Sequence, residues 1–351
     1  LDQGELLGVA LRERPAAVVL AAELQWLDRE LVGRLHEAGI ATVVVDSGCT
    51  ERPVDRIGAS CHLPSLAGPE EILAAISSLR PQCRRVRPEP ASTAGSLVAV
   101  WGAAGSPGRT AVALHLAVAL VSRRRRVVLV DGDAWAPSIA QAVDVSPFPS
   151  VTRAARLASD GWHQPLGSCL QEGPKGVRIL AGLARPDLWL EVRQRAWRGV
   201  LDACREEGEA TVIDLAAPLE EDEELSFDDV PYRRNVMTRT TLEECDHLLF
   251  VIRADPVGVR RAVLAWRELE ELIPDARRRA RVVMNGAPRS AARCRELVAE
   301  LDAYVGLAPA AWLPQESALG DTQWTGKLLD QVAPASPWLA GLRALALAVA
   351  P

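Results

Sequence analysis

The fold is decided by the stretch Ser96–Pro137, which reads SLVAVWGAAGSPGRTAVALHLAVALVSRRRRVVLVDGDAWAP. It begins with an apolar run typical of a buried strand, continues through the glycine-rich turn Gly102–Thr110, and then predicts a helix over Ala111–Val121. A second buried strand, Val127–Val130, ends in Asp131-Gly132-Asp133. Strand, glycine loop, helix, strand and carboxylates, in this order, are the layout of a phosphate-binding loop.

The chemistry of this loop follows from its residue types. Glycines let consecutive backbone N–H groups turn toward phosphate oxygens, and the start of the helix adds the positive end of its dipole. Thr110 offers a hydroxyl to Mg²⁺, while Asp131 and Asp133 supply the oxygen ligands that magnesium prefers. A glycine-rich turn alone also fits an ordinary loop, but the strand before it and the helix and carboxylates after it favour nucleotide binding.

The loop departs from the GxxxxGK[ST] pattern at two positions. Counting back from Thr110, Arg109 occupies the place of the lysine, and Ala103 occupies the place of the first glycine, next to Gly102. Arginine keeps the positive charge but is bulkier and planar, so the exchange is not neutral at a phosphate site. These departures affect the prediction of turnover more than the prediction of binding.

Composition is that of an ordinary soluble protein with room for two domains. The chain has 351 residues, 48% of them hydrophobic, and a net charge of −6, with no 18-residue apolar run and no expected signal peptide. Its seven cysteines are scattered without a C-x-x-C pair, which argues against zinc and disulfides and suits a reducing cytoplasm. Lysine occurs only at Lys175 and Lys327, so 38 of the 40 basic residues are arginine, and arginine runs indicate nucleic acid less strongly than usual.

Residues 1–80 alternate apolar strands with amphipathic helices, as in the back half of a small doubly wound domain. Residues 81–95, rich in proline and arginine, are expected to be a linker, and residues 96–351 to be the domain of the phosphate loop. In the first domain we expect strands at Ala16–Ala21 and Ala41–Val45, and helices at Asp28–Ala38, Val54–Ala59 and Pro69–Leu79.

The second domain continues with further alternating elements. Its last helix carries a single charge, Arg343, and lacks the basic polar face of an interfacial helix, so we expect it to pack on the domain. The expected strands are Val177–Leu180, His247–Ile252, Arg281–Met284 and the apolar run that ends at Asp214, and the expected helices are Leu188–Glu206, Val259–Leu272 and Pro337–Val349.

The segment Gly105–Thr110, together with Val130–Asp133, resembles the ParA/MinD group of deviant-Walker ATPases. The likeness is to the CpaE-like, septum-site-determining branch of actinobacteria, where a GAPGRT-type loop is common. It covers the chain from about Ser96 onward. The resemblance implies an α/β fold with a mostly parallel, doubly wound sheet of the P-loop (SIMIBI-type) ATPase class, preceded by a smaller receiver-like α/β domain.

The N-terminal part carries a resemblance of its own. Arg56–Pro64 is similar to the last part of a response-regulator receiver domain, which precedes the ATPase in CpaE-like proteins. No aspartate ends the strand at Val18–Ala22 to accept phosphate, and no lysine follows Pro64. We interpret residues 1–80 as a truncated pseudo-receiver used for contacts; the alternative is a generic α/β domain without receiver ancestry.

The ParA/MinD resemblance assigns roles to individual residues. It implies that Mg²⁺ is held by Thr110, Asp131 and Asp214, and that Asp133 positions the attacking water while Arg109 brings the charge of the missing lysine. For Asp214 the alternative is an aspartate that caps the next helix. The implied nucleotide contacts are Gly105, Ser106, Pro107, Gly108, Arg109, Thr110 and Ala111 in the loop, Asn285 at the adenine edge, and Pro314, in Trp312-Leu313-Pro314, against the base.

In the family a second lysine of the loop crosses the dimer to the partner's nucleotide, and that position aligns with Ala104. Arg233 and Arg234, in an acidic and basic insert after Asp214, are our candidates to supply this charge across a dimer. We therefore expect a MgATP-binding switch, a slow ATP hydrolase; the alternative is a hydrolysis-deficient pseudo-ATPase that acts as a scaffold.

The partners that the resemblance implies are ATP, a second copy of the chain in a nucleotide-dependent homodimer, and a protein of the septum, pilus or chromosome-partition machinery. The location implied is the cytoplasm, with the inner face of the membrane as a peripheral site. Two basic runs, Arg123–Arg126 and Arg277–Arg281, are candidates for DNA contact, although a solvated corner explains the first and the acidic net charge counts against both.

Overall fold

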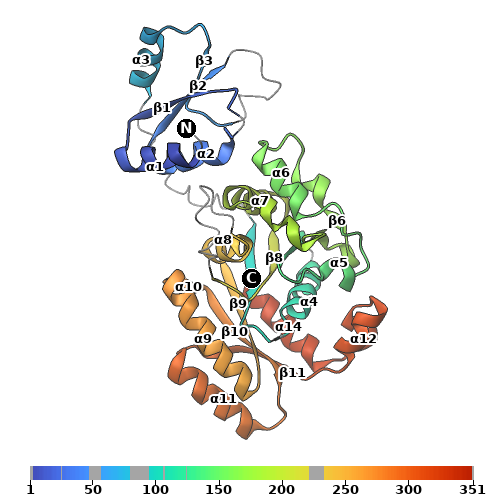
Figure 1. The fold of residues 1–351 in the computed structure, drawn as a ribbon. Coiled ribbons are helices and arrows are strands. Elements are labelled where there is room, and N and C mark those ends of the chain that lie inside the picture. Colours follow the sequence, from blue (N-terminus) through green and yellow to red (C-terminus); the bar gives the residue numbers. More distant parts are fainter. Residues whose placement is uncertain are drawn as a thin grey trace. The chain divides into compact units, whose positions relative to one another are not determined.

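The computed structural model describes residues 3–24, 26–46, 57–79, 95–105, 107–123, 125–220 and 233–349. The chain divides into two compact units (Figure 1). The smaller unit is formed mainly by the residues before Leu79 and holds a three-stranded sheet, while the larger unit, formed by most residues from Gly95 onward, holds an eight-stranded sheet. Within the described residues, no helix combines the length and apolarity that crossing a membrane requires.

The eight-stranded sheet of the larger unit has the order β11-β10-β9-β4-β8-β5-β7-β6. Every neighbouring pair is parallel except β6 with β7. The central strand β4 pairs with β8 on one side and β9 on the other. The strands span Ser96–Trp101 (β4), Val127–Gly132 (β5), Gln171–Glu172 (β6), Arg178–Leu180 (β7), Ala210–Leu215 (β8), His247–Arg253 (β9), Ala280–Ala287 (β10) and Pro309–Pro314 (β11).

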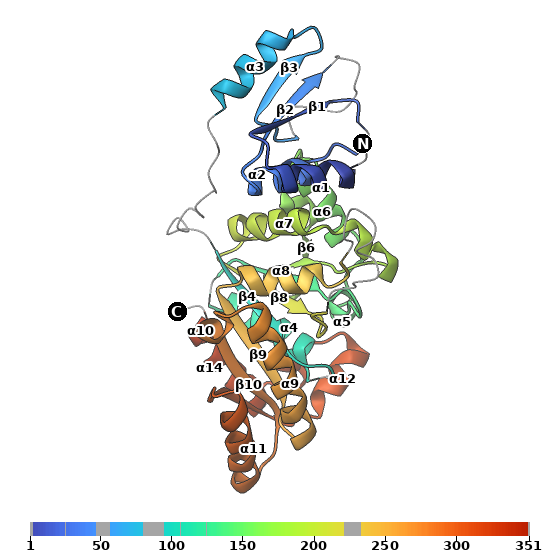
Figure 2. The same cartoon turned by 60° about the vertical axis from the view of Figure 1, so that its left-hand side comes forward.

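Helices cover both faces of this sheet. One layer contains α4 and α14, which contact each other, and Figure 2 shows α8, α9 and α11 in front of the sheet. The α-helices are α4 (Arg109–Val121), α5 (Ile139–Ala142), α6 (Val151–Ser159), α7 (Gln194–Glu207), α8 (Val236–Glu244), α9 (Pro256–Leu272), α10 (Ala276–Arg279), α11 (Ala291–Tyr304), α12 (Ala318–Thr325), α13 (Leu329–Val332) and α14 (Pro337–Val349), with 3-10 turns η2 (Leu166–Cys169), η3 (Pro174–Gly176) and η4 (Pro186–Glu191).

The core of the larger unit lies around α4. This helix is apolar on nearly all sides, as expected for a helix enclosed between a sheet and a second helix, and Val112, Leu116 and Leu120 are fully buried. The C-terminal helix α14 packs on α4 and on β11 and buries Trp338 and Leu342. The expectation that this helix packs on the domain is confirmed.

The smaller unit has a core of its own. Its sheet has the order β1-β2-β3, all parallel, and Leu31, Leu35 and Val44 are buried in one apolar cluster. The elements are α1 (Gln3–Glu13), β1 (Ala17–Ala21), α2 (Arg29–Glu37), β2 (Ala41–Asp46), β3 (Cys61–Pro64) and α3 (Pro69–Ser78).

Two helices of the smaller unit differ from the sequence expectation. The first helix, α1, was not predicted, although Leu7 and Ala10 on one of its faces are buried. The expected helix at Val54–Ala59 is wrong in its described part, 57–59, because Gly58 has a φ of 81° and the chain there is already turning into β3. Residues 54–56 lie outside the described residues.

Two helices of the larger unit also have other boundaries than expected. The single helix expected at Leu188–Glu206 is divided: η4 ends at Glu191, and α7 begins at Gln194 after two residues in extended conformation, one of which, Val192, is buried. Helix α9 begins at Pro256 rather than Val259, because the carboxylate of Asp255 accepts the N–H of Gly258 and caps the first turn.

Candidate functional site

The site lies at the carboxyl edge of the central strands. Because β4, β8 and β5 are parallel neighbours, the residues that follow them meet at one edge of the sheet. The register pairs Asp131 with Asp214, and Asp214 with Val100, one residue before the last residue of β4. The loop 102–108 leads from β4 into α4, so the glycine loop and the two strand-end aspartates come together as the sequence pattern predicted.

Gly102 explains the displaced first glycine of the motif. A Cβ on this residue would lie 2.1 Å from the carbonyl oxygen of Val251 in the neighbouring strand β9. No side chain fits between the two backbones, so the close approach of β9 requires glycine at position 102. The next position can therefore be Ala103. Ser106, a predicted nucleotide contact, lies outside the described residues.

Thr110 and Asp214 form the centre of the site. The hydroxyl of Thr110 donates a hydrogen bond of 2.6 Å to Oδ2 of Asp214. The other oxygen, Oδ1, is buried and has no hydrogen-bond partner among the described residues. Burial first, and the charge of Asp131 second, raise the pKa of Asp214 to about 8. A buried carboxylate oxygen without a donor is the group that a cation or its bound water would satisfy, so this pair fits the predicted Mg²⁺ site.

Asp131 has a different environment from Asp214. Its Oδ2 accepts the backbone N–H groups of Ser138 (2.8 Å) and Ile139 (3.0 Å), and its Oδ1 accepts the N–H of Asp133 (3.3 Å). Burial raises the pKa of Asp131 to about 7 despite these bonds. Both oxygens therefore hold the turn that follows β5, and the assignment of Asp131 to the metal remains a prediction.

Asp133 and Trp135 connect this turn to the segment before α8. Oδ1 of Asp133 accepts the N–H groups of Trp135 (2.7 Å) and Ala136 (2.8 Å). The indole of Trp135 donates to Oδ1 of Asn235 (2.8 Å), and the guanidinium of Arg234 lies 3.7 Å from the centre of the indole ring. Arg234, our candidate for a charge supplied across a dimer, thus contacts an aromatic residue of its own chain.

Arg109 folds back on the loop. Its Nη1 donates to the carbonyl oxygens of Gly102 (2.8 Å) and Ala103 (3.0 Å). Burial lowers the pKa of Arg109, and the charges of Asp214 and Asp133 partly oppose that effect. The arginine at the lysine position therefore closes the loop on itself in this structure.

Asn285 reaches the same loop from β10, while Pro314 does not. The side-chain amide of Asn285 donates 2.7 Å to the carbonyl oxygen of Pro107. Pro314, with Trp312, lines a separate cavity of about 830 Å³ between β11 and α11. Pro314 does not line either of the cavities beside the loop described next, and both base contacts stay predictions.

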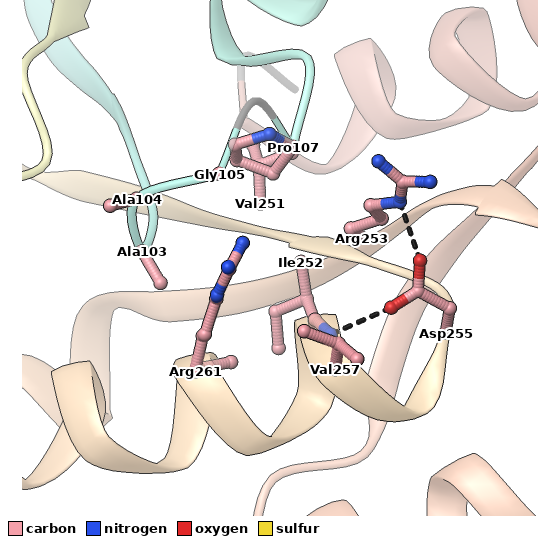
Figure 3. A pocket seen from close by; sticks show the side chains of 12 residues that line it. Ala103, Ala104, Gly105, Pro107, Val251, Ile252, Arg253, Asp255, Val257 and Arg261 are labelled. Carbon is pink, nitrogen blue, oxygen red and sulfur yellow. Dashed lines mark hydrogen bonds and ion pairs between the residues drawn. The ribbon is translucent and has the colours of Figure 1, made fainter.

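Two cavities flank the loop. The larger, about 630 Å³, is within the volume range of ligand sites, about 300–1,000 Å³, and is lined by the start of α4 (residues 108–111), Asp133, Ser138 and α12. The smaller, about 240 Å³, is lined by Ala103–Gly105 and Pro107 of the loop and by β9 and α9 (Figure 3). Each cavity contains a cation that sequence reasoning did not assign: Lys327 in the larger and Arg261 in the smaller.

The basic run 277–281 is engaged in contacts within the chain. Arg277 pairs with Glu270 (2.6 Å), Arg279 with Asp275 (2.8 Å), and Arg281 contacts His247 (3.1 Å). In the other run, Arg124 lies outside the described residues, and the backbone N–H of Arg126 donates to Glu209. These contacts of Arg277, Arg279 and Arg281 are those of structural arginines at the ends of α10 and β10.

Comparison with known proteins shows the fold. No family model matches the chain, and no curated protein matches it. Among solved structures, a ParA family ATPase from Chlorobium tepidum TLS aligns with a TM-score of 0.59 and 16% identity, over 72% of this chain and 99% of its own. The fold is that of the ParA and MinD ATPases.

Two further structures of this fold contain nucleotide. The septum site-determining protein MinD of Pyrococcus horikoshii OT3, complexed with Mg-ADP, aligns with a TM-score of 0.56 and 17% identity over 73% of this chain and 96% of its own. Cobyrinic acid a,c-diamide synthase of Mycobacterium smegmatis, with bound ADP and magnesium, aligns with a TM-score of 0.54 and 16% identity over 72% and 93%. The predicted fold class, a mostly parallel P-loop ATPase sheet with a smaller parallel sheet before it, is confirmed.

The donor set at the loop between β4 and α4 suits magnesium better than a metal bound by protein side chains alone. Among the described residues, no group of three or more His, Cys, Asp or Glu side chains is placed to hold a metal ion. Mg²⁺ is commonly bound by one or two carboxylates together with substrate phosphates and water. The hydroxyl of Thr110 and the unpartnered oxygen of Asp214 are groups of the kind that such a shell would need from the protein.

Proposed function

We propose that this chain is a MgATP-binding nucleotide switch of the ParA/MinD type. The observation that carries the proposal is the buried Oδ1 of Asp214, which has no donor among the described residues and lies beside the hydroxyl of Thr110 at the start of α4. The nucleotides and magnesium in two solved structures of the same fold support it.

Each residue of the site has a task in this proposal. The backbone N–H groups of the loop and of the first turn of α4 bind phosphate oxygens, and the helix dipole favours their charge. Thr110 and Asp214 would hold Mg²⁺, which would neutralise charge that develops on the phosphates. Asp133 positions the attacking water.

The proposal has two forms, which differ in whether the bound ATP is hydrolysed. We favour a slow ATPase, in which Arg109 leaves the carbonyl oxygens of Gly102 and Ala103 when phosphate binds. The alternative is a hydrolysis-deficient pseudo-ATPase that acts as a scaffold. Its support is that Arg109 is already committed within the loop, and that Ala104 carries no charge where the family has its crossing lysine.

The cellular role proposed is that of a CpaE-like, actinobacterial septum-site-determining protein that positions septum, pilus or chromosome. It would act in the cytoplasm or at the inner face of the membrane, as a nucleotide-dependent homodimer with a protein partner, and with DNA as a weaker candidate. Residues 1–80 would be its truncated pseudo-receiver domain, residues 81–95 its linker, and residues 96–351 its ATPase domain.

The test is calorimetric titration of ATP with Mg²⁺ and with EDTA. We expect Thr110→Ala to weaken MgATP binding about tenfold or more, since a hydrogen bond or ligand to a charged group contributes about 1.5–3 kcal/mol, and to change metal-free binding little. Thr110→Ser, which keeps the hydroxyl, is the matched control. Equal losses with and without Mg²⁺ would contradict the metal role, and phosphate release under the same conditions separates the ATPase from the scaffold.

A further inference from the structure

A second arginine lies against the phosphate loop. Arg261, in the second turn of α9, points from the helix toward the loop in Figure 3. A Cβ built on Gly105 would lie 2.0 Å from Nη1 of Arg261 and 3.1 Å from its Cζ. The guanidinium therefore occupies the space where a side chain at position 105 would be.

The position of Arg261 follows from the sheet. Strand β9 pairs with β4, so the end of β9 and the start of α9 lie beside the loop that follows β4. Asp255 fixes the first turn of α9, because one of its oxygens accepts the N–H of Gly258 (2.7 Å) and the other pairs with Arg253 (2.5 Å). A fixed first turn aims the next turn, and with it Arg261, at Gly105.

The cavity around Arg261 has positive charge that is not balanced within it. Its only acid among the lining residues is Asp255, which Arg253 and the N-terminus of α9 already occupy (Figure 3). Arg261 is exposed, and no carboxylate of the described residues forms an ion pair with it. The rest of the wall is backbone and small apolar side chains of the loop. With a volume of about 240 Å³, the cavity is smaller than the sites that hold whole ligands, about 300–1,000 Å³.

We propose that Arg261 is a phosphate-binding residue of the loop, which supplies within one chain the positive charge that Ala104 lacks. The ligand class is the phosphoryl end of a nucleoside triphosphate held in the loop. Arginine suits this task because its planar donors pair with two phosphate oxygens at once. The inference deepens the proposed function and rests on it.

Calorimetric titrations with MgATP and with tripolyphosphate test this role. We expect Arg261→Ala to bind both about tenfold more weakly, since a charge-assisted hydrogen bond contributes about 1.5–3 kcal/mol, and Arg261→Lys to recover part of the loss. Arg260→Ala is the matched control, because Arg260 is exposed on the same turn of α9 and does not line the cavity. The affinity of the parent should also fall more steeply with added salt than that of Arg261→Ala.

The outcomes separate this inference from the proposed function. If the parent binds MgATP and Arg261→Ala binds as tightly as Arg260→Ala, the role of Arg261 is refuted and nucleotide binding stands. A loss for MgATP without a loss for tripolyphosphate would place Arg261 at the sugar or base and also refute it. If the parent binds no MgATP, both proposals fail. Should Arg261→Ala be unfolded in thermal melts, Arg261→Gln, which keeps most of the stem without the charge, gives the decisive titration.

Discussion

The side-chain amide of Asn285 donates a hydrogen bond of 2.7 Å to the carbonyl oxygen of Pro107. Its oxygen accepts one of 2.8 Å from the indole N–H of Trp338, a fully buried residue of α14. One side chain at the end of β10 thus joins the phosphate loop to the C-terminal helix.

Replacing Asn285 by Ala should therefore affect both stability and binding. The free energy of unfolding in urea should fall by about 1–3 kcal/mol, because the buried indole N–H of Trp338 loses its acceptor. MgATP and tripolyphosphate should both bind more weakly, because Pro107 is no longer held.

Trp338→Phe is the control, because it removes the indole donor and leaves the bond to Pro107. It should therefore lower stability without weakening nucleotide binding. A variant Asn285→Ala that discriminates less between ATP and GTP, with tripolyphosphate binding unchanged, would instead support adenine recognition.

The two lysines of the chain offer a matched pair of variants. Lys327 is exposed and lines the 630 Å³ cavity with Arg109 and Thr110, whereas Lys175 pairs with Asp330. Lys327→Ala should weaken nucleotide binding about fivefold, since an exposed ion pair contributes up to about 1 kcal/mol. Lys175→Ala should bind nucleotide like the parent. Equal affinities for all three proteins by calorimetry would exclude Lys327 from the site.

Arg234 tests the predicted dimer. With ATP and Mg²⁺, sedimentation velocity should show a dimer that Arg234→Ala abolishes while nucleotide affinity stays nearly intact. For this role the guanidinium must leave the ring of Trp135, which is 45% exposed, so Trp135→Leu should leave the dimer in place. A double variant with alanine at 233 and 234 that dimerises and turns over ATP like the parent would contradict the hypothesis.

His115 predicts a pH dependence of stability. Nδ1 of this buried imidazole contacts the carbonyl oxygen of Ala111, and Nε2 accepts the N–H of Leu329. Because Nε2 acts as an acceptor, the ring is in its neutral form. Burial lowers the pKa of His115, with the bond to Ala111 and the charge of Asp330 opposing. As the pH falls through about 6.5, the unfolded chain takes up a proton that the folded chain does not, so the free energy of unfolding should fall on acidification.

The measurement is urea unfolding at a series of pH values between 5 and 8. The parent should lose more stability below pH 6.5 than His115→Gln, and above that pH the two curves should run parallel. A parent and variant that lose stability equally on acidification would show that His115 does not contribute to this dependence.

The pseudo-receiver interpretation predicts that residues 1–80 accept no phosphate. The strand β1 ends at Ala21 and is followed by Ala22, without an aspartate at this position. After incubation with a small phosphodonor, intact-mass analysis should show no acid-labile adduct. A stoichiometric adduct on an aspartate of this segment would overturn the interpretation.

Much of the fold could be predicted because its central strands are short, mainly apolar runs that are followed by glycine or aspartate. Such runs identify β4, β5 and β8, and parallel pairing then brings Thr110 next to Asp214 without further information. The break before α7 could not be predicted, because the sequence does not show that Val192 is extended and buried in the tertiary structure.

The rest of the site depends on where side chains from distant parts of the chain point in the folded structure, which the sequence alone does not contain. Arg261 and Lys327 are exposed side chains without periodic pattern, and each lines a cavity beside the loop from a part of the chain that is distant in sequence. The sequence contains only weak signals that these two residues belong to the site. Lys327 is one of only two lysines, and Arg261 lies in the helix that follows β9, a strand next to β4. Asp131 is a predicted metal ligand from the residue pattern and the resemblance, and its three backbone donors are a tertiary feature that the sequence does not contain.

The bonds from Arg109 to Gly102 and Ala103 have a kinetic consequence. They fix the first residues after β4 by contacts within the chain, so the conformational entropy of ordering this part of the loop is lost during folding rather than during association. In the proposed ATPase form, Arg109 leaves both carbonyl oxygens when phosphate binds, so this rearrangement would add to diffusion and to the charge around the cavity mouth in setting the on-rate. The reverse rearrangement, in which Arg109 regains its two carbonyl partners, would accompany dissociation of the nucleotide.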